Sequence, residues 1–420
     1  MESETIAQAE RSISTANIDI PMSFKSRVSV VQNLNDPEVL AKRIQQIERI
    51  LNTQPVDLDA LHTVSRLEGG FINNELRQRV WPKFLGVNRY LASDFRQYSM
   101  DKDSQVYKKI KCDIERSFWN FSHCREWDET RLEKKRALLS DIITATLTHN
   151  PDLQYYQGFH DVTSVFIEVF EGEEDLSFLL VEAVSKHFLR DYMGKDFANV
   201  TEALSLILQI VKKVDVKLYA FLTKSMTEPY FAVSWLITWF SHDLRDLQTV
   251  ARVFDALITS HPMFCLYMCT ALVLSCKEEL FAMDCEMSKV HSYLVNVCEN
   301  KKVSFDRIIM KADNLILALP PSRLKILAGL DMRNQIARKQ VTIFLKPPCI
   351  TRYCDTDAVL LEEFKKRKDA EVAARLREEL QAHAEQTPND RGHSLKWLSH
   401  TFLGGIYNFI QSDKSEATDK

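Results

Sequence analysis

The chain has 420 residues, of which 45% are hydrophobic and 27% charged, and this composition is ordinary for a globular protein. Its formal net charge of −4 argues against binding nucleic acid through bulk positive charge, because such domains usually have an isoelectric point above about 9. Glycine accounts for 10 residues, where an average composition would give about 30. Few glycines mean few tight turns, so we expect an all-α protein of long helices joined by short connections.

The chain contains nine cysteines, an odd number, and they form no Cys-x-x-Cys pair. Most of them lie in apolar or helical sequence, which is typical of free, buried thiols in a reducing compartment. No apolar signal sequence opens the chain.

The beginning of the chain is rich in Ser, Thr, Gln and Asn and has no sustained period, so we expect residues 1–34 to be disordered. Asp36 and Pro37 suit the N-cap and the first position of a helix. Apolar residues then follow at helical spacing as far as Leu51, which predicts the first helix.

A second apolar segment runs from Glu75 to Gly86. Pro82 lies inside it and predicts a kink, while Gly86 predicts the end of the helix. Trp81 is expected in the core.

Residues 104–121 predict a helix in which Ile110, Asp113 and Arg116 recur every three residues and therefore lie along one side. On spacing alone, Asp113 and Arg116 would be an exposed ion pair that contributes little to stability. Residues 131–148 predict another helix.

A loop is predicted immediately before Gly158, because the apolar run Val162–Phe170 that follows indicates a buried helix. Gln157 would then lie just before a helix N-terminus, where free backbone N–H groups favour anionic ligands. An amide held there by Tyr155, Tyr156 and Gly158 can orient a water or a phosphate. The alternative is that Gln157 only caps the helix and that the tyrosines only pack.

Later in the chain, Pro229–Phe240 predicts one dense aromatic helix of about 12 residues, too short to span a bilayer, which takes about 17–25. Further helices are predicted from Val250 and from His261-Pro262. The regular pattern fades near Pro320-Pro321.

Beyond that point we interpret residues 321–355 as a linker, 356–386 as a charged helix with a thin apolar stripe, and 387–420 as an amphipathic tail. Residues 395–410 place apolar side chains on one helical face. This segment is expected either to make a peripheral, in-plane contact with a membrane or to dock on the main domain. No convincing membrane-spanning helix is found.

Five separated motifs, in order between residues 65 and 320, resemble those of TBC-domain proteins, the GTPase-activating proteins of Rab GTPases. The Ile-x-x-Asp-x-x-Arg motif resembles the family's I-x-x-D-x-x-R signature, and the doubled tyrosine fits its Y-x-Q-G element. The matching segments are Arg77–Gly86, Ile110-x-x-Asp113-x-x-Arg116, Tyr155-Tyr156-Gln157-Gly158, Ser234-Trp235 to Phe240, and Arg252-x-x-Asp255.

This resemblance implies an all-α TBC fold of two packed helical subdomains over residues 35–320. It also implies that Arg116 acts as an arginine finger and Gln157 as a glutamine finger that replaces the GTPase's own glutamine. Phosphoryl transfer depends on positioning and charge stabilisation, which a planar, permanently charged guanidinium can supply. A supplied arginine can raise the rate about 10³–10⁵-fold.

The resemblance further implies supporting roles around the two fingers. Asp113 would orient the guanidinium, Tyr156 would fix the loop and Ile110 would pack. The supporting residues are Ile110, Asp113, Tyr155, Tyr156 and Gly158.

The sequence is most similar to the endoplasmic-reticulum-associated branch of the family, through Tyr155-Tyr156-Gln157-Gly158 and the segment His187–Asp191. The resemblance implies a Rab of the early secretory route in its GTP state as partner, on the cytoplasmic side of endoplasmic reticulum or Golgi membranes. It implies no metal or cofactor of its own, because the Rab carries GTP and Mg²⁺. The absence of a G-x-x-x-x-G-K-[ST] loop agrees with this.

Two other interpretations are left open by the sequence. One is a non-catalytic scaffold that binds a Rab without accelerating hydrolysis. The other is a helical metal-dependent phosphohydrolase, suggested by the HD pairs His160-Asp161 and His242-Asp243. In the TBC interpretation, His160 and Asp161 are the first turn of a helix, where an acidic residue is favourable.

Overall fold

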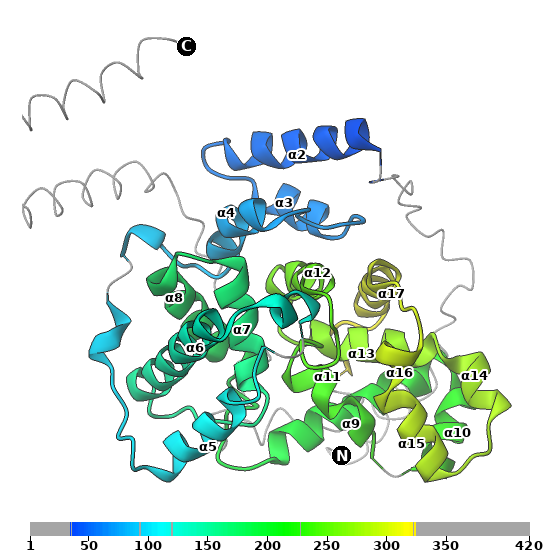
Figure 1. Cartoon of the computed structure of the whole chain (residues 1–420). Helices are drawn as coiled ribbons and strands as arrows, with labels where there is room; N and C mark the ends of the chain where they lie inside the picture. The colour runs from blue at the N-terminus through cyan, green and yellow to red at the C-terminus, as the bar shows by residue number, and fades with distance from the viewer. Residues whose placement is uncertain are drawn as a thin grey trace, which may run out of the picture. The chain divides into compact units, whose positions relative to one another are not determined.

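The computed structural model describes residues 34, 36–91, 94–118, 121–226, 228–321, 323 and 324, and within this part of the chain every regular element is a helix (Figure 1). The expected all-α fold is thus confirmed for the described residues. None of their helices is long and apolar enough to cross a membrane. The predictions for the N-terminal segment before Leu34, the linker, the charged helix 356–386 and the tail 387–420 lie outside the described residues.

An N-terminal group of helices ends at α8. Its first helix begins as predicted, because the Asp36 side chain accepts a hydrogen bond from the backbone N–H of Glu38 and Pro37 follows. The members are α2 (Pro37–Leu51), α3 (Leu58–Ser65), α4 (Asn74–Phe84), α5 (Gln105–Ile114), α6 (Glu129–His149), α7 (Phe159–Val169) and α8 (Glu174–Val184), with short 3-10 turns η1 (Arg89–Leu91), η2 (Phe95–Gln97) and η3 (Ser122–Glu126).

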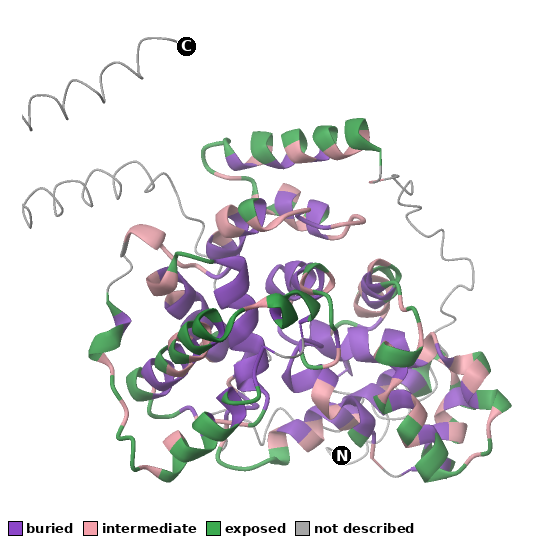
Figure 2. Cartoon of the chain, in the orientation of Figure 1, coloured by how far each residue is buried: buried purple, intermediate pink, exposed green. Residues whose placement is uncertain are grey.

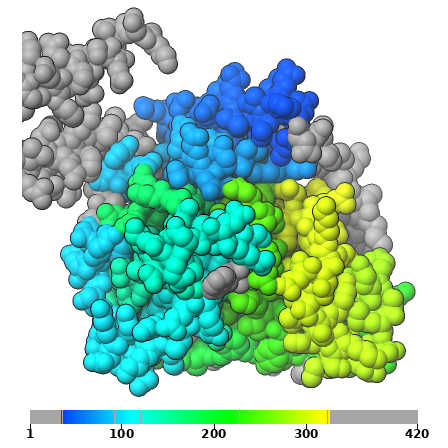
Figure 3. All heavy atoms as spheres, viewed as in Figure 1, coloured from blue at the N-terminus to red at the C-terminus, as the bar shows by residue number. Residues whose placement is uncertain are grey.

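A C-terminal group follows a single π turn, η4 (Ser185–Leu189). Its helices α14 to α17 appear in yellow on one side of the face shown in Figure 3, away from the cyan surface around α5 and α6. The members are α9 (Ala198–Val214), α10 (Val216–Ser225), η5 (Tyr230–Ala232), α11 (Val233–Ile237), α12 (Leu247–Ile258), α13 (Phe264–Leu274), α14 (Lys277–Ala282), α15 (Met287–Val295), α16 (Val297–Asn300) and α17 (Phe305–Ala318).

Helix α7 lies at the centre of the N-terminal group, and every one of its residues is buried (Figure 2). It contacts α6 and α8 on its own side and α12 of the C-terminal group, which also contacts α4. The apolar run after Gly158 is therefore a buried helix, as predicted. Because Gly158 is the N-cap of α7, the core fixes the position of the loop that carries Gln157.

A buried ion cluster ties α4 to α12. The carboxylate of Asp255 accepts hydrogen bonds from Arg77 Nε at 3.1 Å and from Trp81 Nε1 at 2.8 Å, and all three side chains are buried. Trp81 also packs edge-on against Phe166 of α7, with ring centroids 5.6 Å apart. The prediction that Trp81 is a core residue is confirmed. Pro82 lies inside α4 and Gly86 follows its end with a left-handed φ of 67°.

Two predicted helices are wrong in extent. The helix expected over 104–121 ends at Ile114, because the Ser117 hydroxyl bonds the Ile114 carbonyl and Phe118 has a φ of 68°, which no right-handed helix accepts. The single aromatic helix expected over 229–240 is instead η5 followed by the short α11. The chain then reverses through Trp239 and Phe240, both left-handed at φ 54° and 64°.

Candidate functional site: an arginine and the glutamine loop joined by one carboxylate

Arg116 lies in a turn just past the end of α5, not on the helix as the spacing predicted. Its backbone N–H donates to the Asp113 carbonyl at 3.1 Å, which tightens the last turn. The side chain is 70% exposed. The guanidinium is thus presented on the surface from a defined backbone position.

Asp113 holds this guanidinium. Arg116 Nη2 donates to Asp113 Oδ1 at 2.8 Å, and Nε reaches the Cys112 carbonyl at 3.3 Å. The Asp113 side chain is 9% exposed, so the carboxylate is a buried anchor for an exposed arginine. The predicted orienting contact is present.

Tyr155 joins the second segment to the same carboxylate. Its hydroxyl donates to Asp113 Oδ2 at 2.8 Å. Burial, followed by this hydrogen bond, raises the pKa of Tyr155 above its ordinary value of 10, so the hydroxyl keeps the proton that it donates. One carboxylate therefore binds Arg116 through one oxygen and the Gln157 loop through the other.

Two further contacts fix the position of the loop that carries Gln157. The Tyr156 hydroxyl donates to the Ile237 carbonyl at the end of α11, at 2.7 Å. Gly158 has a φ of 109°, and a Cβ at that position would lie 2.8 Å from Thr238 Cγ2. Only glycine satisfies both the dihedral angle and the close approach. These contacts leave little freedom to the residue between Tyr156 and Gly158.

That residue, Gln157, is exposed, and it does not cap α7, because the N-cap is Gly158 without a side-chain bond. The alternative of a purely capping glutamine is therefore wrong. Some of the backbone N–H groups expected to be free at the start of α7 already have hydrogen-bond partners. The N–H of Phe159 donates to the Tyr156 carbonyl, and that of Asp161 donates to the Gly158 carbonyl. The group in this loop that is best placed to contact a ligand is therefore the exposed Gln157 amide, and not the helix N-terminus.

The remaining predicted residue, Ile110, is fully buried on α5. The structure thus brings Arg116, Asp113 and Tyr155 into direct contact, and places Tyr156 and Gly158 on either side of Gln157. Sequence reasoning missed the part played by the HD pairs, which it weighed as metal ligands. The signal was present, since Asp161 falls in the first turn after the loop.

The HD pairs do not converge on a metal site. Asp161 Oδ2 already accepts a hydrogen bond from His242 Nδ1 at 2.9 Å, and the Asp243 carboxylate accepts from the Ser234 hydroxyl at 2.8 Å. Among the described residues, three potential ligand atoms lie within 4.8 Å of one another elsewhere, at His123, Cys124 and Glu168.

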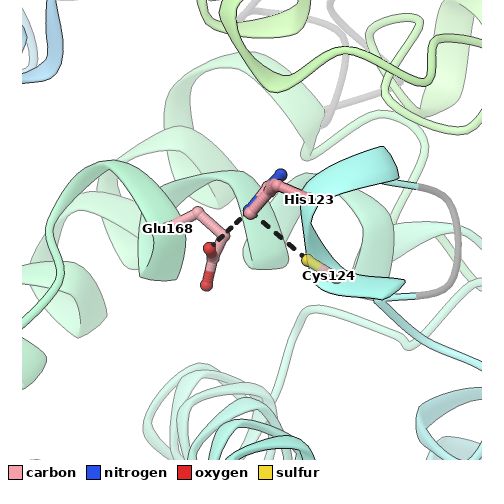
Figure 4. A group of neighbouring side chains, drawn as sticks. All are labelled: His123, Cys124 and Glu168. Atoms are coloured by element: carbon pink, nitrogen blue, oxygen red, sulfur yellow. Dashed lines mark hydrogen bonds and ion pairs between the residues drawn. The ribbon is translucent and has the colours of Figure 1, made fainter. Parts of the chain in front are cut away.

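That second group, shown in Figure 4, is a structural ion cluster. His123 Nε2 lies 3.0 Å from Glu168 Oε2 and 3.4 Å from Cys124 Sγ. The ammonium of Lys135 lies 2.9 Å from Glu168 Oε1 and balances its charge. Burial raises the pKa of Cys124 to about 12, so its thiol stays protonated at neutral pH. We interpret the cluster as a link between η3, α6 and α7.

The family is established by comparison with known proteins. The model of the Rab-GTPase-TBC domain matches residues 74–281. TBC1 domain family member 20 of Mus musculus is 35% identical over 283 residues, which cover 67% of this chain and 69% of that protein. The GTPase-activating protein gyp10 of Schizosaccharomyces pombe is 30% identical over 294 residues, which cover 68% of this chain and 76% of that protein. The chain belongs to the TBC-domain family of Rab GTPase-activating proteins.

Solved structures agree with the fold. The Ypt/Rab-GAP domain of Gyp1p superposes with a TM-score of 0.54 at 19% identity and covers 69% of this chain and 99% of that domain. A Chlamydomonas flagellar RabGAP TBC domain gives a TM-score of 0.51 at 17% identity, covering 66% of this chain and 91% of that domain.

Proposed function

We propose that this protein accelerates GTP hydrolysis by a Rab GTPase, supplying Arg116 and Gln157 in trans to the GTPase active site. The observation that carries the proposal is the Asp113 carboxylate, which binds Arg116 through one oxygen and Tyr155, two residues before Gln157, through the other. The Arg116 side chain and the loop that carries Gln157, about 40 residues further along the chain, are thereby attached to one buried group.

Arg116 is held in place and still available. Its ion pair with Asp113 is exposed on the arginine side, where solvent screens it, so a γ-phosphate can compete for the guanidinium. Among the described residues, the hydrogen bonds of the guanidinium use Nε and Nη2, so Nη1 can donate to a ligand. The fork of donors can then stabilise the negative charge that develops on the transferring oxygens.

Gln157 supplies the complementary group. Its amide oxygen accepts a hydrogen bond and its NH₂ donates two, so it can accept from an attacking water while donating to a phosphate oxygen. Positioning this water is the step that a slow GTPase performs poorly. GTP and Mg²⁺ belong to the Rab in this proposal, and the GTP-bound Rab is the partner.

The proposed cellular setting rests on the family branch. The similarity to TBC1 domain family member 20 and to the GTPase-activating protein gyp10 supports a Rab substrate, and the branch points to early secretory traffic on the cytoplasmic face of endoplasmic reticulum or Golgi membranes. Residues 395–410 would provide a peripheral contact with that membrane.

The proposal is tested by single-turnover GTP hydrolysis on a panel of purified Rabs. We expect one or a few Rabs to be accelerated by the wild-type chain, and the acceleration to fall by about 10³-fold or more in Arg116→Ala and by a smaller factor in Gln157→Ala. Arg49→Ala, which removes an exposed arginine of α2, is the matched control and should behave as wild type. A Rab that binds the folded chain but hydrolyses GTP at its intrinsic rate would favour the scaffold interpretation.

A further inference from the structure

The hydrogen-bonded contacts around Asp113 continue beyond Tyr155 in a direction that the family motifs do not include. His160 Nδ1 lies 3.3 Å from the Tyr155 hydroxyl oxygen, and His160 Nε2 lies 3.5 Å from Asp161 Oδ1. The other oxygen, Asp161 Oδ2, lies 2.9 Å from His242 Nδ1. A polar relay therefore runs from His242 through Asp161 and His160 to Tyr155.

The relay is buried in the middle and exposed at its ends. The side chains of Asp161 and His160 are 7% and 10% exposed, whereas that of His242 is 57% exposed. At the other end the relay meets Asp113 and the exposed Arg116. A buried carboxylate needs its oxygens satisfied, and for Asp161 one of the donors is the imidazole of His242.

The hydrogen-bond directions along the relay are constrained. The Tyr155 hydroxyl has one proton and gives it to Asp113, so its oxygen is left to accept from His160 Nδ1. On its other side the His160 ring lies next to Asp161, with Nε2 3.5 Å from Asp161 Oδ1, which is a contact and not a hydrogen bond, while Asp161 Oδ2 accepts a hydrogen bond from His242. Removal of the His242 donor would take away the hydrogen bond to Asp161 Oδ2 and so weaken the constraint on the carboxylate that lies against the His160 ring.

His242 is also coupled to the glutamine loop. Its backbone N–H donates to Thr238 Oγ1 at 3.4 Å, and Thr238 Cγ2 is the atom that packs against Gly158. In the chain segment between Thr238 and His242, Trp239 and Phe240 both have left-handed φ angles. Two consecutive non-glycine residues at positive φ cost energy, and such strain clusters at functional sites.

We propose that His242 and Asp161 are positioning residues of this site, which act through His160 and Tyr155 to fix the carboxylate that orients Arg116. This inference rests on the proposed function. According to this proposal, full activity requires one further hydrogen-bond donor. That donor is an N–H at the Nδ1 position of residue 242, directed at Asp161 Oδ2. The imidazole is not required to touch the GTPase.

A matched pair of substitutions tests that requirement. His242→Asn places an amide N–H where Nδ1 lies, whereas His242→Gln places the same amide one bond further out. With a Rab that wild type accelerates, we expect His242→Gln, His242→Ala and Asp161→Asn to lower kcat about 10-fold with KM within about 2-fold, since small misplacements of a catalytic group have effects of this order. His242→Asn should restore kcat to within about 2-fold of wild type.

The outcomes separate this inference from the proposed function. If Arg116→Ala leaves the acceleration intact, the finger mechanism itself fails. If Arg116→Ala abolishes it but all three His242 variants keep the wild-type kcat, the positioning role alone is wrong. An increase in KM at unchanged kcat, equal for Asn and Gln, would make His242 a direct contact of the GTPase and would also overturn the proposal. Melting temperatures of the exposed His242 variants within a few degrees of wild type confirm that the kcat changes report the site.

Discussion

A single buried carboxylate, that of Asp113, determines where Arg116 lies. An exposed arginine has many rotamers, and an arginine selected by one anchored hydrogen bond loses less entropy when a phosphate binds. The resemblance to the TBC family implied that Asp113 orients the guanidinium. It did not identify Tyr155 as the second ligand of the same carboxylate, because a contact between residues 42 apart depends on how α5 and α7 pack.

Gly158 makes a prediction at this scale. Gly158→Ala introduces a Cβ 2.8 Å from Thr238 Cγ2 at a φ of 109°, and we expect a loss of about 1–3 kcal/mol together with a reduced acceleration of the Rab. Gly172→Ala is the control, because Gly172 also has a positive φ, of 86°, but no atom lies within 4 Å of the added Cβ. Urea unfolding should show a loss in both variants, and GTP hydrolysis should change in Gly158→Ala alone. Equal activity of the two variants would contradict the account of the loop.

The raised pKa of Asp243 predicts that the stability of the fold depends on pH. Burial raises its pKa from 3.8 to about 6, although the Ser234 hydroxyl and His242 oppose the shift. The folded state therefore holds this proton more tightly than the unfolded state, and the stabilisation that the neutral acid provides is lost as pH rises from about 4 through about 6. Asp161, on α7, adds to the shift, and Arg245 opposes it.

The substitution Asp243→Asn keeps a neutral group in the same volume. We expect it to exceed the wild type in free energy of unfolding by about 1–3 kcal/mol at pH 8 and to match it at pH 4. Urea unfolding across this range measures the difference. A stability difference that does not change with pH would show that the carboxyl does not titrate in this window.

At the scale of helices, the sequence was most informative where local chemistry decides the boundary. Asp36 and Pro37 start α2, and the glycine at residue 158 precedes a buried apolar helix, as expected. It was least informative at the end of α5 and in Pro229–Phe240. There, left-handed residues such as Phe118 and Trp239 end the helices, and neither residue type signals a positive φ.

The two adjacent tyrosines have separate roles in holding the loop. Tyr155→Phe removes the donor to Asp113, and we expect about 10-fold slower Rab-stimulated hydrolysis. Tyr156→Phe leaves the Ile237 carbonyl without its donor, and we expect a stability loss of about 1–2 kcal/mol with less than about 3-fold change in rate. Hydrolysis kinetics and urea unfolding of both variants measure this division. The reverse pattern would contradict it.

At the scale of the whole domain, motifs distant in sequence form one buried cluster. Arg77 and Trp81 of α4 both bind Asp255 of α12, so the R-x-x-x-W and R-x-x-D segments meet in this cluster. Composition predicted the fold class, and spacing predicted several of the helices, including α2, α4, α6 and α7. They did not predict which charged residues pair across the core, because such pairing is set by tertiary packing and not by local pattern.

Asp255→Asn tests how much that cluster contributes to the free energy of unfolding. The substitution leaves the buried Arg77 guanidinium without a counter-charge, and we expect a loss of about 3–5 kcal/mol. The control is Glu173→Gln, which breaks the exposed Arg89–Glu173 pair of 2.8 Å and should lose less than about 1 kcal/mol. Comparable losses in urea unfolding would mean that Asp255 does not hold the two helix groups together.

The central claim is that Arg116 and Gln157 recognise the transition state of hydrolysis on a partner Rab. The most direct measurement is the affinity of the chain for an accelerated Rab loaded with GDP, with and without aluminium fluoride, which mimics the transferring phosphoryl group. We predict at least about 100-fold tighter binding to the fluoride complex, because transition-state analogues bind more tightly than ground states, and loss of that gain in Arg116→Ala and Gln157→Ala. Equal affinity for the two forms, or a gain that survives in both variants, would contradict the account.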